Sequence, residues 1–254
     1  MYIERTDSTN TLLREMIAKG EWQAGEEYLY TGFQTAGRGQ SGNGWESEEG
    51  KNLLCSILID PQKVKDKRPF FLNVAVSVAV HRMVNSQFSI LHSQLTIKWP
   101  NDIYWKDKKI AGILVENALI GSEVRYSIAG IGLNVNQTEW LSNAPNPVSM
   151  RQISGEEYDI HELMKTLMNK MHTVLAMKRE EVWTYYRTHL YRKDGFWPFV
   201  EREVSIAPTM NANKETEGIF LAKIENIRAD GEIELRDQEG NLRLYHFKEV
   251  RYVI

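Results

Sequence analysis

The segment Gly37–Trp45 has the sequence GRGQSGNGW and combines residue types that suit the binding of a phosphate-bearing ligand. Glycines let a backbone close around an anion, the guanidinium of Arg38 offers a fork of donors, and the indole of Trp45 offers a stacking face. The first six letters also match the dinucleotide pattern G-x-G-x-x-G. The segment predicts a phosphate-binding loop or, as the plainer alternative, an exposed hairpin loop.

The residues after this loop fit none of the common glycine-rich nucleotide loops. A dinucleotide loop opens a helix that holds the pyrophosphate, whereas 43–52 lacks helical periodicity and leads into an apolar strand. A Walker A loop has the pattern G-x-x-x-x-G-K-[ST], whereas five residues separate Gly44 from Gly50 here and Asn52 replaces the hydroxyl residue. No HRD or DFG sequence follows, as it would in a protein kinase. The context excludes all three.

The stretch KWPND is a second candidate for ligand binding. It ends a predicted strand at Lys98 and turns at a proline, which presents Asn101 and Asp102. Oxygens of Asn and Asp suit Mg²⁺ or nucleotide hydroxyls. The same residues are ordinary turn formers, so the stretch by itself favours a simple turn.

Two strands with internal glycines are the third candidate. In KKIAGILVE, Lys109 stands just ahead of an apolar run that contains Gly112, and in GIGLNVN, Gly130 and Gly132 precede Asn134. A glycine inside a strand often marks the close approach of a ligand. The plainer alternatives are a solvated turn lysine for Lys109 and a β-bulge for the paired glycines.

Hydrophobic periodicity predicts the elements that must position these stretches. Helices are expected at 10–20, at 69–86 and from 159 to about 190. Strands are expected at 26–33, 52–60, 94–99, 102–105, 109–119 and 125–135. The glycine loop would then join two strands.

The character of the sequence changes after Trp197-Pro198. Short strand-like runs with turn signals at Asp230-Gly231 and Glu239-Gly240 occupy 201–209, 217–247 and 248–254. A unit of this size cannot hold a large core alone. The sequence predicts a larger domain over 1–197 and a small all-β domain over 198–254, which packs against it as an SH3-sized barrel.

Composition bounds the class of protein. The chain has 254 residues, 42% hydrophobic and 26% charged, as soluble globular proteins do, and its net charge of −3 gives no support to nucleic-acid binding. No signal-peptide core or apolar span of membrane length is present, so a cytoplasmic protein without membrane or nucleic-acid partners is expected. The single cysteine, Cys55, lies in an apolar run and is expected to be a buried core thiol. The six histidines show no metal-ligand spacing.

Taken together and in this order, the candidate stretches resemble the motifs of biotin protein ligases, the enzymes that attach biotin to carboxylase carrier domains. The matching residues are Ser8-Thr9-Asn10, Gln34–Gly39 with Trp45, Lys98–Asp102, Lys109–Leu114 and Gly130–Asn134. The resemblance implies an α/β (α+β) fold. Its catalytic domain would be a mixed sheet flanked by helices, related to class II aminoacyl-tRNA synthetases and lipoate ligases, followed by the small SH3-like β barrel.

The resemblance also implies a two-step reaction. The biotin carboxylate would attack the α-phosphate of ATP, giving biotinyl-5′-AMP and pyrophosphate, and a lysine amine of a biotin carboxyl carrier domain would then displace AMP. Lys109 matches the family lysine that bridges the biotin carboxyl group and the phosphate, and Arg38 matches the loop arginine. These two are the predicted catalytic residues, with ATP and Mg²⁺ as cofactors.

Matching the family residue by residue gives the implied ligand contacts. Biotin is predicted to contact Ser8, Thr9, Asn10, Gln34, Gly37, Arg38, Gly39, Gln40, Lys109, Gly112, Gly130 and Gly132, the last three leaving room for its ring and chain. ATP is predicted to contact Arg38, Trp45, Lys98, Asn101, Asp102, Lys109 and Asn134, with Mg²⁺ near Asn101 and Asp102. Trp45 would stack on the adenine. A helix cap at Ser8 and Thr9 and a core position for Trp45 are the plainer alternatives.

The glycine loop departs from the family pattern. Many bacterial members carry GRGRRGRxW, whereas Gln40, Ser41 and Asn43 stand at the later arginine positions here. Fewer cations predict weaker phosphate contact and a loop ordered by backbone amides and Trp45 rather than by arginine pairs. Family members that repress biotin synthesis carry an N-terminal helix-turn-helix domain. The motifs begin at Ser8 in this sequence, so a repressor role is not expected.

Two other functions stay open, a lipoate–protein ligase and a non-catalytic module that holds biotin or nucleotide. The GRG…W loop and the KWPND–KIAGIL pair favour biotin over lipoate, and the presence of both Arg38 and Lys109 favours catalysis. A strand edge could support a homodimer. A basic run suits an acidic carrier domain, although a solvated loop is the plainer explanation; it comprises Lys63, Lys65, Lys67 and Arg68.

Overall fold

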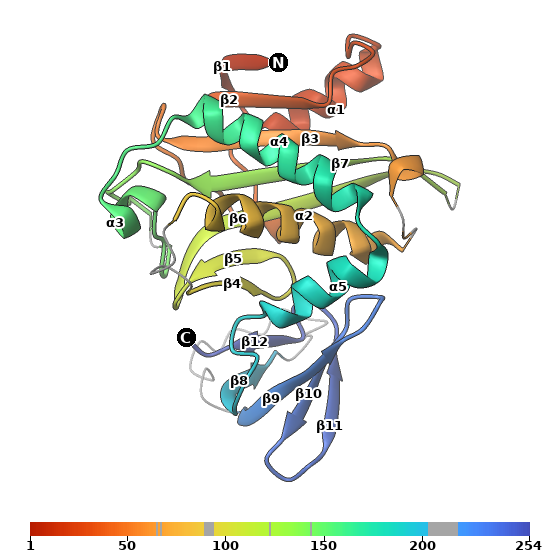
Figure 1. The fold of residues 1–254 in the computed structure, drawn as a ribbon, viewed down its shortest axis with the longest axis vertical. Helices are drawn as coiled ribbons and strands as arrows, with labels where there is room; N and C mark the ends of the chain where they lie inside the picture. The colour runs from red at the N-terminus through yellow and green to blue at the C-terminus, as the bar shows by residue number, and fades with distance from the viewer. Residues whose placement is uncertain (65, 67, 89–93, 122, 143, 203–217) are drawn as a thin grey trace, which may run out of the picture.

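The computed structural model describes residues 1–254 except 65, 67, 89–93, 122, 143 and 203–217, and it leaves the side chain of Ser41 undescribed (Figure 1). Two sheets organise the chain, a seven-stranded one above and a five-stranded one below. Lys65 and Lys67 of the basic run, the histidine at position 92 and most of the strand expected at 201–209 lie outside the described residues.

The larger sheet has the strand order β1-β2-β3-β7-β6-β5-β4. The pair β1 and β2 is parallel and the other neighbours are antiparallel, so the sheet is mixed, as expected. Its strands are β1 (Tyr2–Thr6), β2 (Tyr28–Gln34), β3 (Asn52–Ile59), β4 (Leu95–Lys98), β5 (Asp102–Trp105), β6 (Lys108–Ile120) and β7 (Glu123–Asn134). All but β1 were predicted, and β1 is too short and too polar to stand out by periodicity.

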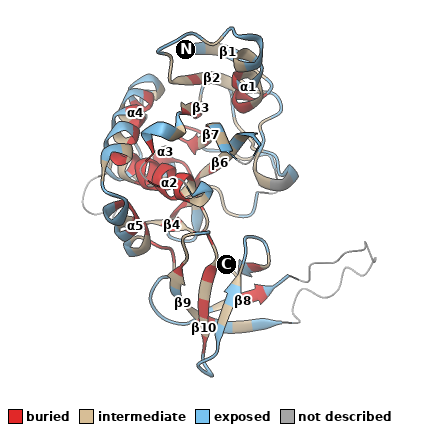
Figure 2. Ribbon diagram, turned by 90° about the vertical axis from the view of Figure 1, so that its right-hand side faces the viewer, coloured by how far each residue is buried: buried red, intermediate tan, exposed pale blue. Residues whose placement is uncertain are grey.

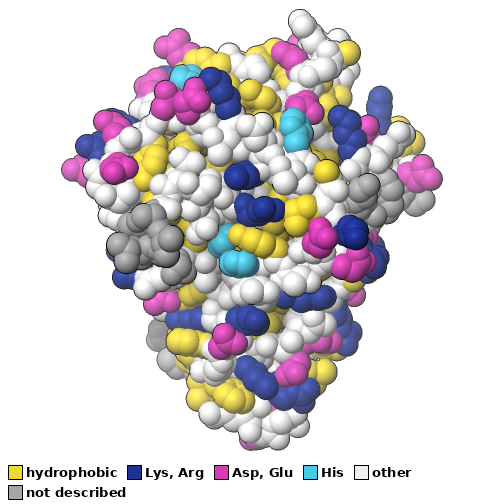
Figure 3. Space-filling model, viewed as in Figure 1, with side chains coloured by type: hydrophobic (Ala, Val, Ile, Leu, Met, Phe, Trp, Pro, Cys, Tyr) yellow, Lys and Arg dark blue, Asp and Glu magenta, His cyan; other side chains and the backbone are white. Residues whose placement is uncertain are grey.

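The helices divide between the two faces of this sheet (Figure 2). They are α1 (Thr9–Lys19), α2 (Pro69–Asn85), α3 (Met150–Ser154), α4 (Ile160–Ala176) and α5 (Arg179–Thr188). Side chains alternate along β3: Leu53, Cys55 and Ile57 pack in the large cluster under α2 and α4. On the other side of the strand, Ser56 bonds to Thr9 and Asn10 of α1, and Leu58 packs with Leu13. Figure 3 shows the α2–α4 face, over which basic and acidic side chains are interspersed.

The single helix expected from 159 to about 190 is two helices, which corrects that prediction. Met177 and Lys178 adopt extended backbone angles between α4 and α5. The break turns α5 across the start of α2, where the Trp183 ring lies 6.1 Å from that of Phe70. Periodicity continues through such a break because both helices bury an apolar face. None of the helices in the described part of the chain is long and apolar enough to cross a membrane.

The smaller sheet has the order β11-β10-β9-β8-β12, with antiparallel neighbours. Its strands are β8 (Trp197–Glu201), β9 (Ile219–Ile227), β10 (Ile233–Asp237), β11 (Leu242–Tyr245) and β12 (Val250–Tyr252). Both predicted turns hold a glycine at positive φ, 103° at Gly231 and 90° at Gly240. Among the described residues no pairing of β11 with β12 closes the sheet. Trp99 joins the two sheets by donating from Nε1 to the Gly231 carbonyl at 2.9 Å.

Candidate functional site

A cavity of about 450 Å³ lies where the start of α1, the glycine loop, β6, β7 and the smaller sheet meet. It is on the sheet face that carries α1. All but three of the predicted site residues line it, namely Ser8, Thr9, Asn10, Gln34, Arg38, Gly39, Gln40, Trp45, Lys98, Asp102, Lys109, Gly112, Gly130 and Gly132. The fold therefore brings together stretches that lie far apart in the sequence.

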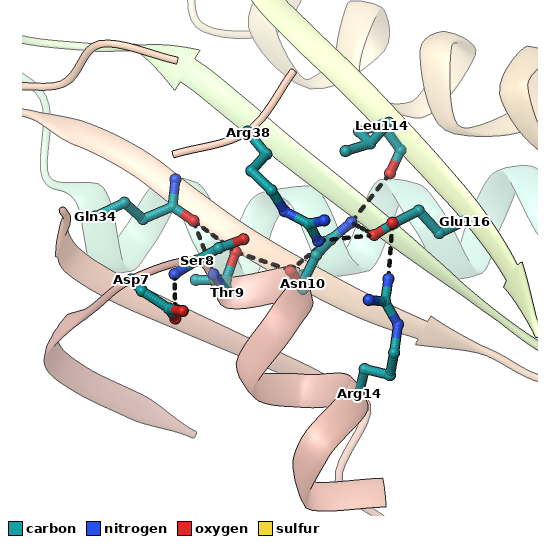
Figure 4. Close-up of polar contacts among 10 residues, drawn as sticks. Asp7, Ser8, Thr9, Asn10, Arg14, Gln34, Arg38, Leu114 and Glu116 are labelled. Atoms are coloured by element: carbon teal, nitrogen blue, oxygen red, sulfur yellow. Dashed lines mark hydrogen bonds and ion pairs between the residues drawn. The ribbon is translucent and has the colours of Figure 1, made fainter. Parts of the chain in front are cut away.

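One end of this cavity, at the start of α1, is a network of neutral polar side chains (Figure 4). Gln34 Oε1 accepts hydrogen bonds from the Thr9 backbone N–H at 2.8 Å and from Thr9 Oγ1 at 3.1 Å. Ser56 Oγ lies 2.8 Å from Thr9 Oγ1 and donates to Asn10 Oδ1 at 2.5 Å. Ser8, Thr9 and Asn10 are almost fully buried. The network is fixed before any ligand arrives.

Ser8 begins α1 as its N-cap residue, but its side chain makes no capping hydrogen bond. The first turn of α1 begins beside the cavity, and Ser8 is part of the cavity lining. A helix cap was the plainer alternative for Ser8. Ser8 does occupy the N-cap position, but its side chain does not form the capping hydrogen bond.

The opposite end of the cavity is cationic. Lys109 Nζ pairs with an Asp102 carboxylate oxygen at 2.8 Å, and Lys98 Nζ lies 4.9 Å from the Tyr104 ring centroid. Burial lowers the pKa of Lys98 from its usual value, while Asp102 opposes the shift. Of the residues that the structure describes, six basic side chains and one carboxylate, that of Asp102, line the cavity as a whole: Arg38, which lies at the α1 end, and Lys98, Lys109, Arg202, Lys248 and Arg251. Such an excess of positive charge suits an anionic ligand.

The glycine loop forms its own small hairpin. Two backbone hydrogen bonds close it: the Gly39 N–H donates to the Asn43 carbonyl at 2.6 Å, and the Trp45 N–H donates to the Gly37 carbonyl at 2.9 Å. The residues between include a short 3₁₀ turn, η1 (Gln40–Gly42), and no α-helix follows before β3. These bonds confirm that the loop joins two strands and does not belong to a dinucleotide-binding unit.

The strand glycines differ from expectation in what fills the space beside them. A Cβ at Gly132 or Gly112 would collide with the Trp45 ring, and a Cβ at Gly130 would collide with the Asn10 amide. We expected these glycines to leave room for biotin, whereas protein side chains occupy that space here. The glycines are still required, because they let Trp45 and Asn10 lie directly against the sheet.

A second cavity of about 850 Å³ adjoins the first, with Trp45 and Lys109 lining both. Gly37 and Asn134, two of the three predicted residues missing from the first cavity, line this one. Asn134 Nδ2 donates to the Val148 carbonyl at 3.1 Å, and its buried Oδ1 has no partner among the described residues. A buried acceptor without a donor is suited to a ligand that brings one.

One wall of this second cavity is formed by residues that follow β7: Trp140, Ser142 and Ala144–Pro147. The Glu46 carboxylate accepts hydrogen bonds from the backbone N–H groups of Leu141 at 2.7 Å and Ser142 at 2.8 Å. Farther along, the Lys109 N–H donates to Asn146 O at 2.8 Å, and the Lys109 carbonyl accepts from Val148 N–H at 3.0 Å. These contacts therefore link Glu46, just after the glycine loop, and Lys109 at the start of β6 to the residues that follow β7.

Asn101 lies outside both cavities. Its Nδ2 donates to Asn73 Oδ1 on α2 at 2.7 Å, its Oδ1 accepts from Gln40 Nε2 at 3.4 Å, and it is 1% exposed. The expectation that it contacts nucleotide or Mg²⁺ is not met by this geometry, because the turn directs its amide toward α2. Asp102, its neighbour, does line both cavities.

Several site residues escaped the sequence analysis. Ser56, fully buried on β3, was hidden in an apolar run, although a lone serine there is a usable signal. Arg202, Phe247, Lys248 and Arg251 come from the smaller sheet, and nothing in their sequence context indicates a distant cavity. Cys55 is buried as expected, and burial raises the pKa of its thiol to about 12, so it is no nucleophile. No cluster of metal-ligating side chains exists among the described residues.

Comparison with known proteins gives the family. The model of the biotin/lipoate A/B protein ligase family matches residues 2–134. The bifunctional ligase/repressor BirA of Bacillus spizizenii is 32% identical over 220 residues, which are 84% of this chain and 62% of that protein. The biotin–[acetyl-CoA-carboxylase] ligase of Mycobacterium tuberculosis is 32% identical over 135 residues, which are 53% and 48% of the two chains. The chain spans less than two thirds of the length of these relatives.

Solved structures share the fold. A biotin protein ligase from Aquifex aeolicus in complex with biotin and ATP matches with a TM-score of 0.73 at 22% identity, covering 100% of this chain and 98% of that one. One from Leishmania major in complex with biotinyl-5-AMP matches with a TM-score of 0.66 at 19% identity, covering 96% and 97%. Residues 2–134 are more than half of the 254-residue chain, and the chain belongs to the biotin/lipoate A/B protein ligase family.

Proposed function

We propose that this protein is an ATP-dependent biotin–protein ligase that forms biotinyl-5′-AMP and transfers biotin to a lysine of a biotin carboxyl carrier domain. The observation that carries the proposal is the polarity of the first cavity. Neutral, mutually bonded side chains line one end, and Lys98 and Lys109 with the carboxylate of Asp102 lie at the other. Biotin has the matching polarity, with a neutral ureido ring at one end and a carboxylate at the other.

The ring of biotin would lie against Thr9, Asn10 and Gln34, with the buried Ser56 behind them. These side chains offer acceptors and donors within a few ångströms of one another, as an N–H and carbonyl pair requires. The ligand must displace part of what fills the cavity beside Gly112 and Gly132, so a shift of the Trp45 ring accompanies binding. The valeryl chain would then lead toward Lys109.

The first chemical step takes place between the biotin carboxylate and the α-phosphorus of ATP. A carboxylate oxygen forms the new O–P bond while the bond to the β-phosphate oxygen breaks, and pyrophosphate leaves with the electron pair. Lys109 and Arg38 would stabilise the charge that builds on the phosphoryl oxygens. Fixed donors of this kind contribute about 2.7–4 kcal/mol each in other enzymes. In the second step the acceptor amine attacks the acyl carbon, AMP leaves, and the amine loses a proton.

The nucleotide would extend from the first cavity into the second. The adenine would lie beside Trp45 in the second cavity, and its exocyclic amine would donate to the unpartnered Oδ1 of Asn134. Mg²⁺ would arrive with the phosphates, because Asp102 is the one carboxylate among the described residues that line the first cavity. The basic side chains of the smaller sheet, Arg202, Lys248 and Arg251, would add to the field around the triphosphate.

The chain would divide into a catalytic domain over 1–197, related to class II aminoacyl-tRNA synthetases, and a small SH3-like barrel over 198–254. The smaller sheet would flank the path of the carrier lysine, since its residues line the cavity beside Lys98. The enzyme would work in the cytoplasm.

The rival functions are a lipoate–protein ligase and a binding module without catalysis. The neutral network favours biotin, because lipoate has a dithiolane ring that cannot use hydrogen-bonding partners. Incorporation of labelled biotin into a biotin carrier domain and of labelled lipoate into a lipoyl carrier domain, with Mg-ATP present, separates them. Biotin incorporation alone is expected. Lipoate incorporation would reassign the substrate, and failure of both would leave a binding module.

A further inference from the structure

Glu116 lies on β6 just beyond the cavity lining, and its carboxylate joins three side chains from two other segments (Figure 4). Asn10 Nδ2 donates to Glu116 Oε2 at 2.6 Å. Arg14 pairs with Glu116 Oε1 at 2.7 Å, and Arg38 pairs with Glu116 Oε2 at 3.4 Å. One carboxylate thus ties the α1 helix and the glycine loop to the central sheet.

The contact with Asn10 decides which atom of the Asn10 amide faces the cavity. An ionised carboxylate can only accept hydrogen bonds, so the Asn10 Nδ2 group must turn toward Glu116. Asn10 Oδ1 is thereby directed at Ser56 Oγ and at the space beside Gly130. A neutral amide at position 116 would accept either orientation of Asn10, because it contains both a donor and an acceptor.

The two arginine contacts differ in a way that supports the same role. Arg14 makes the shorter pair and Arg38 the longer one. When an anion draws Arg38 toward the cationic end, Glu116 keeps Arg14 and Asn10 as partners and is not left uncompensated. The carboxylate can therefore hold the loop arginine along the cavity wall without preventing its movement.

We propose that Glu116 is a positioning residue that fixes the amide orientation of Asn10, and with it the donor and acceptor pattern offered to the substrate ring, while it orients Arg38 for the incoming phosphate. The role deepens the proposed biotin ligase function and rests on it. Glu116 touches neither ring nor phosphate and is assigned no chemical step.

The test is a double-mutant cycle in biotin affinity, measured by calorimetry on the full chain. Glu116→Gln should weaken biotin binding about tenfold, the size expected from loss of one hydrogen bond to a charged group. In an Asn10→Ala background the same substitution should change affinity less than twofold, because no amide remains to orient. Glu116→Asp, which keeps an acceptor-only group, should bind biotin with intermediate affinity. Glu49→Gln is the matched control, since Glu49 pairs with Arg5 on the surface.

Two results overturn the positioning role. One is a Glu116→Gln variant that binds biotin as tightly as wild type, and the other is an equal loss in both backgrounds, which would mark a general structural effect. Thermal melting of each variant separates unfolding from weaker binding. A wild-type chain that does not bind biotin would instead refute the proposed function, so the two failures are distinguishable.

Discussion

The two ends of the first cavity contrast in how their polar groups are satisfied. At the α1 end, Thr9, Asn10, Gln34 and Ser56 are bonded to one another and buried or half-buried. At the Lys109 end, Lys98 and Lys109 lie near a single carboxylate, that of Asp102, and the Lys109 side chain is 31% exposed. A neutral ring can be recognised by a network that is complete before binding, whereas an anion needs charge that the protein leaves uncompensated. The difference predicts where substitutions act on affinity and where they act on rate.

Loss of Lys109 should give the largest effect, a loss of reaction rate with little change in biotin affinity. Lys109→Ala should reduce biotin-dependent exchange of pyrophosphate into ATP by about 100- to 1,000-fold, corresponding to about 2.7–4 kcal/mol for one fixed donor. Biotin affinity should change far less, since the ring end is untouched. Lys108→Ala, at the exposed neighbouring position, is the control and should remain active. A variant of Lys109 with near-normal exchange would remove the basis for assigning chemistry to this end.

Loss of Ser56 should affect affinity instead. Ser56→Ala removes the donor to Asn10 Oδ1 and leaves a buried acceptor unsatisfied, which costs about 1–3 kcal/mol. Biotin binding should weaken about tenfold, with little change in the maximal rate. Ser127→Ala is matched, because Ser127 is equally buried on β7 and donates to Asn117. A similar loss of biotin affinity in both variants would show that the effect comes from the sheet and not from the network.

An added cation at the glycine loop should act on the intermediate. Gln40 lines the cavity, and its Nε2 bonds only weakly to Asn101 Oδ1 at 3.4 Å. Gln40→Arg should slow release of biotinyl-5′-AMP by about fivefold, as one partly exposed charged contact contributes up to about 1 kcal/mol. The release rate is measured by trapping the free adenylate. Equal rates in the two proteins would contradict the expectation that the missing loop cations weaken phosphate contact.

The smallest expected effect concerns stability. Burial lowers the pKa of Lys98 in the folded state, so the unfolded chain binds more protons between the folded pKa and the usual lysine value. The cost of the buried charge is therefore fully present below the folded pKa and disappears as the pH rises from the folded pKa to the usual lysine value. Lys98→Met should increase the free energy of unfolding at pH 7 by about 1 kcal/mol. Denaturant titrations at pH 7 and near pH 10 check this, and a gain that does not shrink with pH would contradict it.

Much of the site could be predicted because its residues lie at the ends of strands or are glycines within strands, and hydrophobic periodicity locates those strands. Lys98, Asp102 and Lys109 met as expected because β4, β5 and β6 are joined by short turns. The break between α4 and α5 was not predictable, since both helices continue the same apolar spacing. Arg251 and Lys248 reach the cavity through packing of one sheet on another, which no local pattern encodes.

The glycines show a further limit of sequence reasoning. Gly130 and Gly132 correctly indicated a close approach, but the approaching groups are Asn10 and Trp45 of the same chain. A strand glycine marks the absence of a side chain and not the identity of what fills the space. Glu116 illustrates the converse, because its three partners come from two distant segments, α1 and the glycine loop, and its sequence context is an ordinary strand.

One experiment tests the central claim most directly, a single turnover of the wild-type protein with biotin and Mg-ATP in the absence of any carrier domain. The account predicts biotinyl-5′-AMP, identified by mass spectrometry, together with an equal amount of pyrophosphate. Formation of ADP and phosphate, or the absence of any biotin-dependent product from a folded protein that binds both ligands, would contradict it.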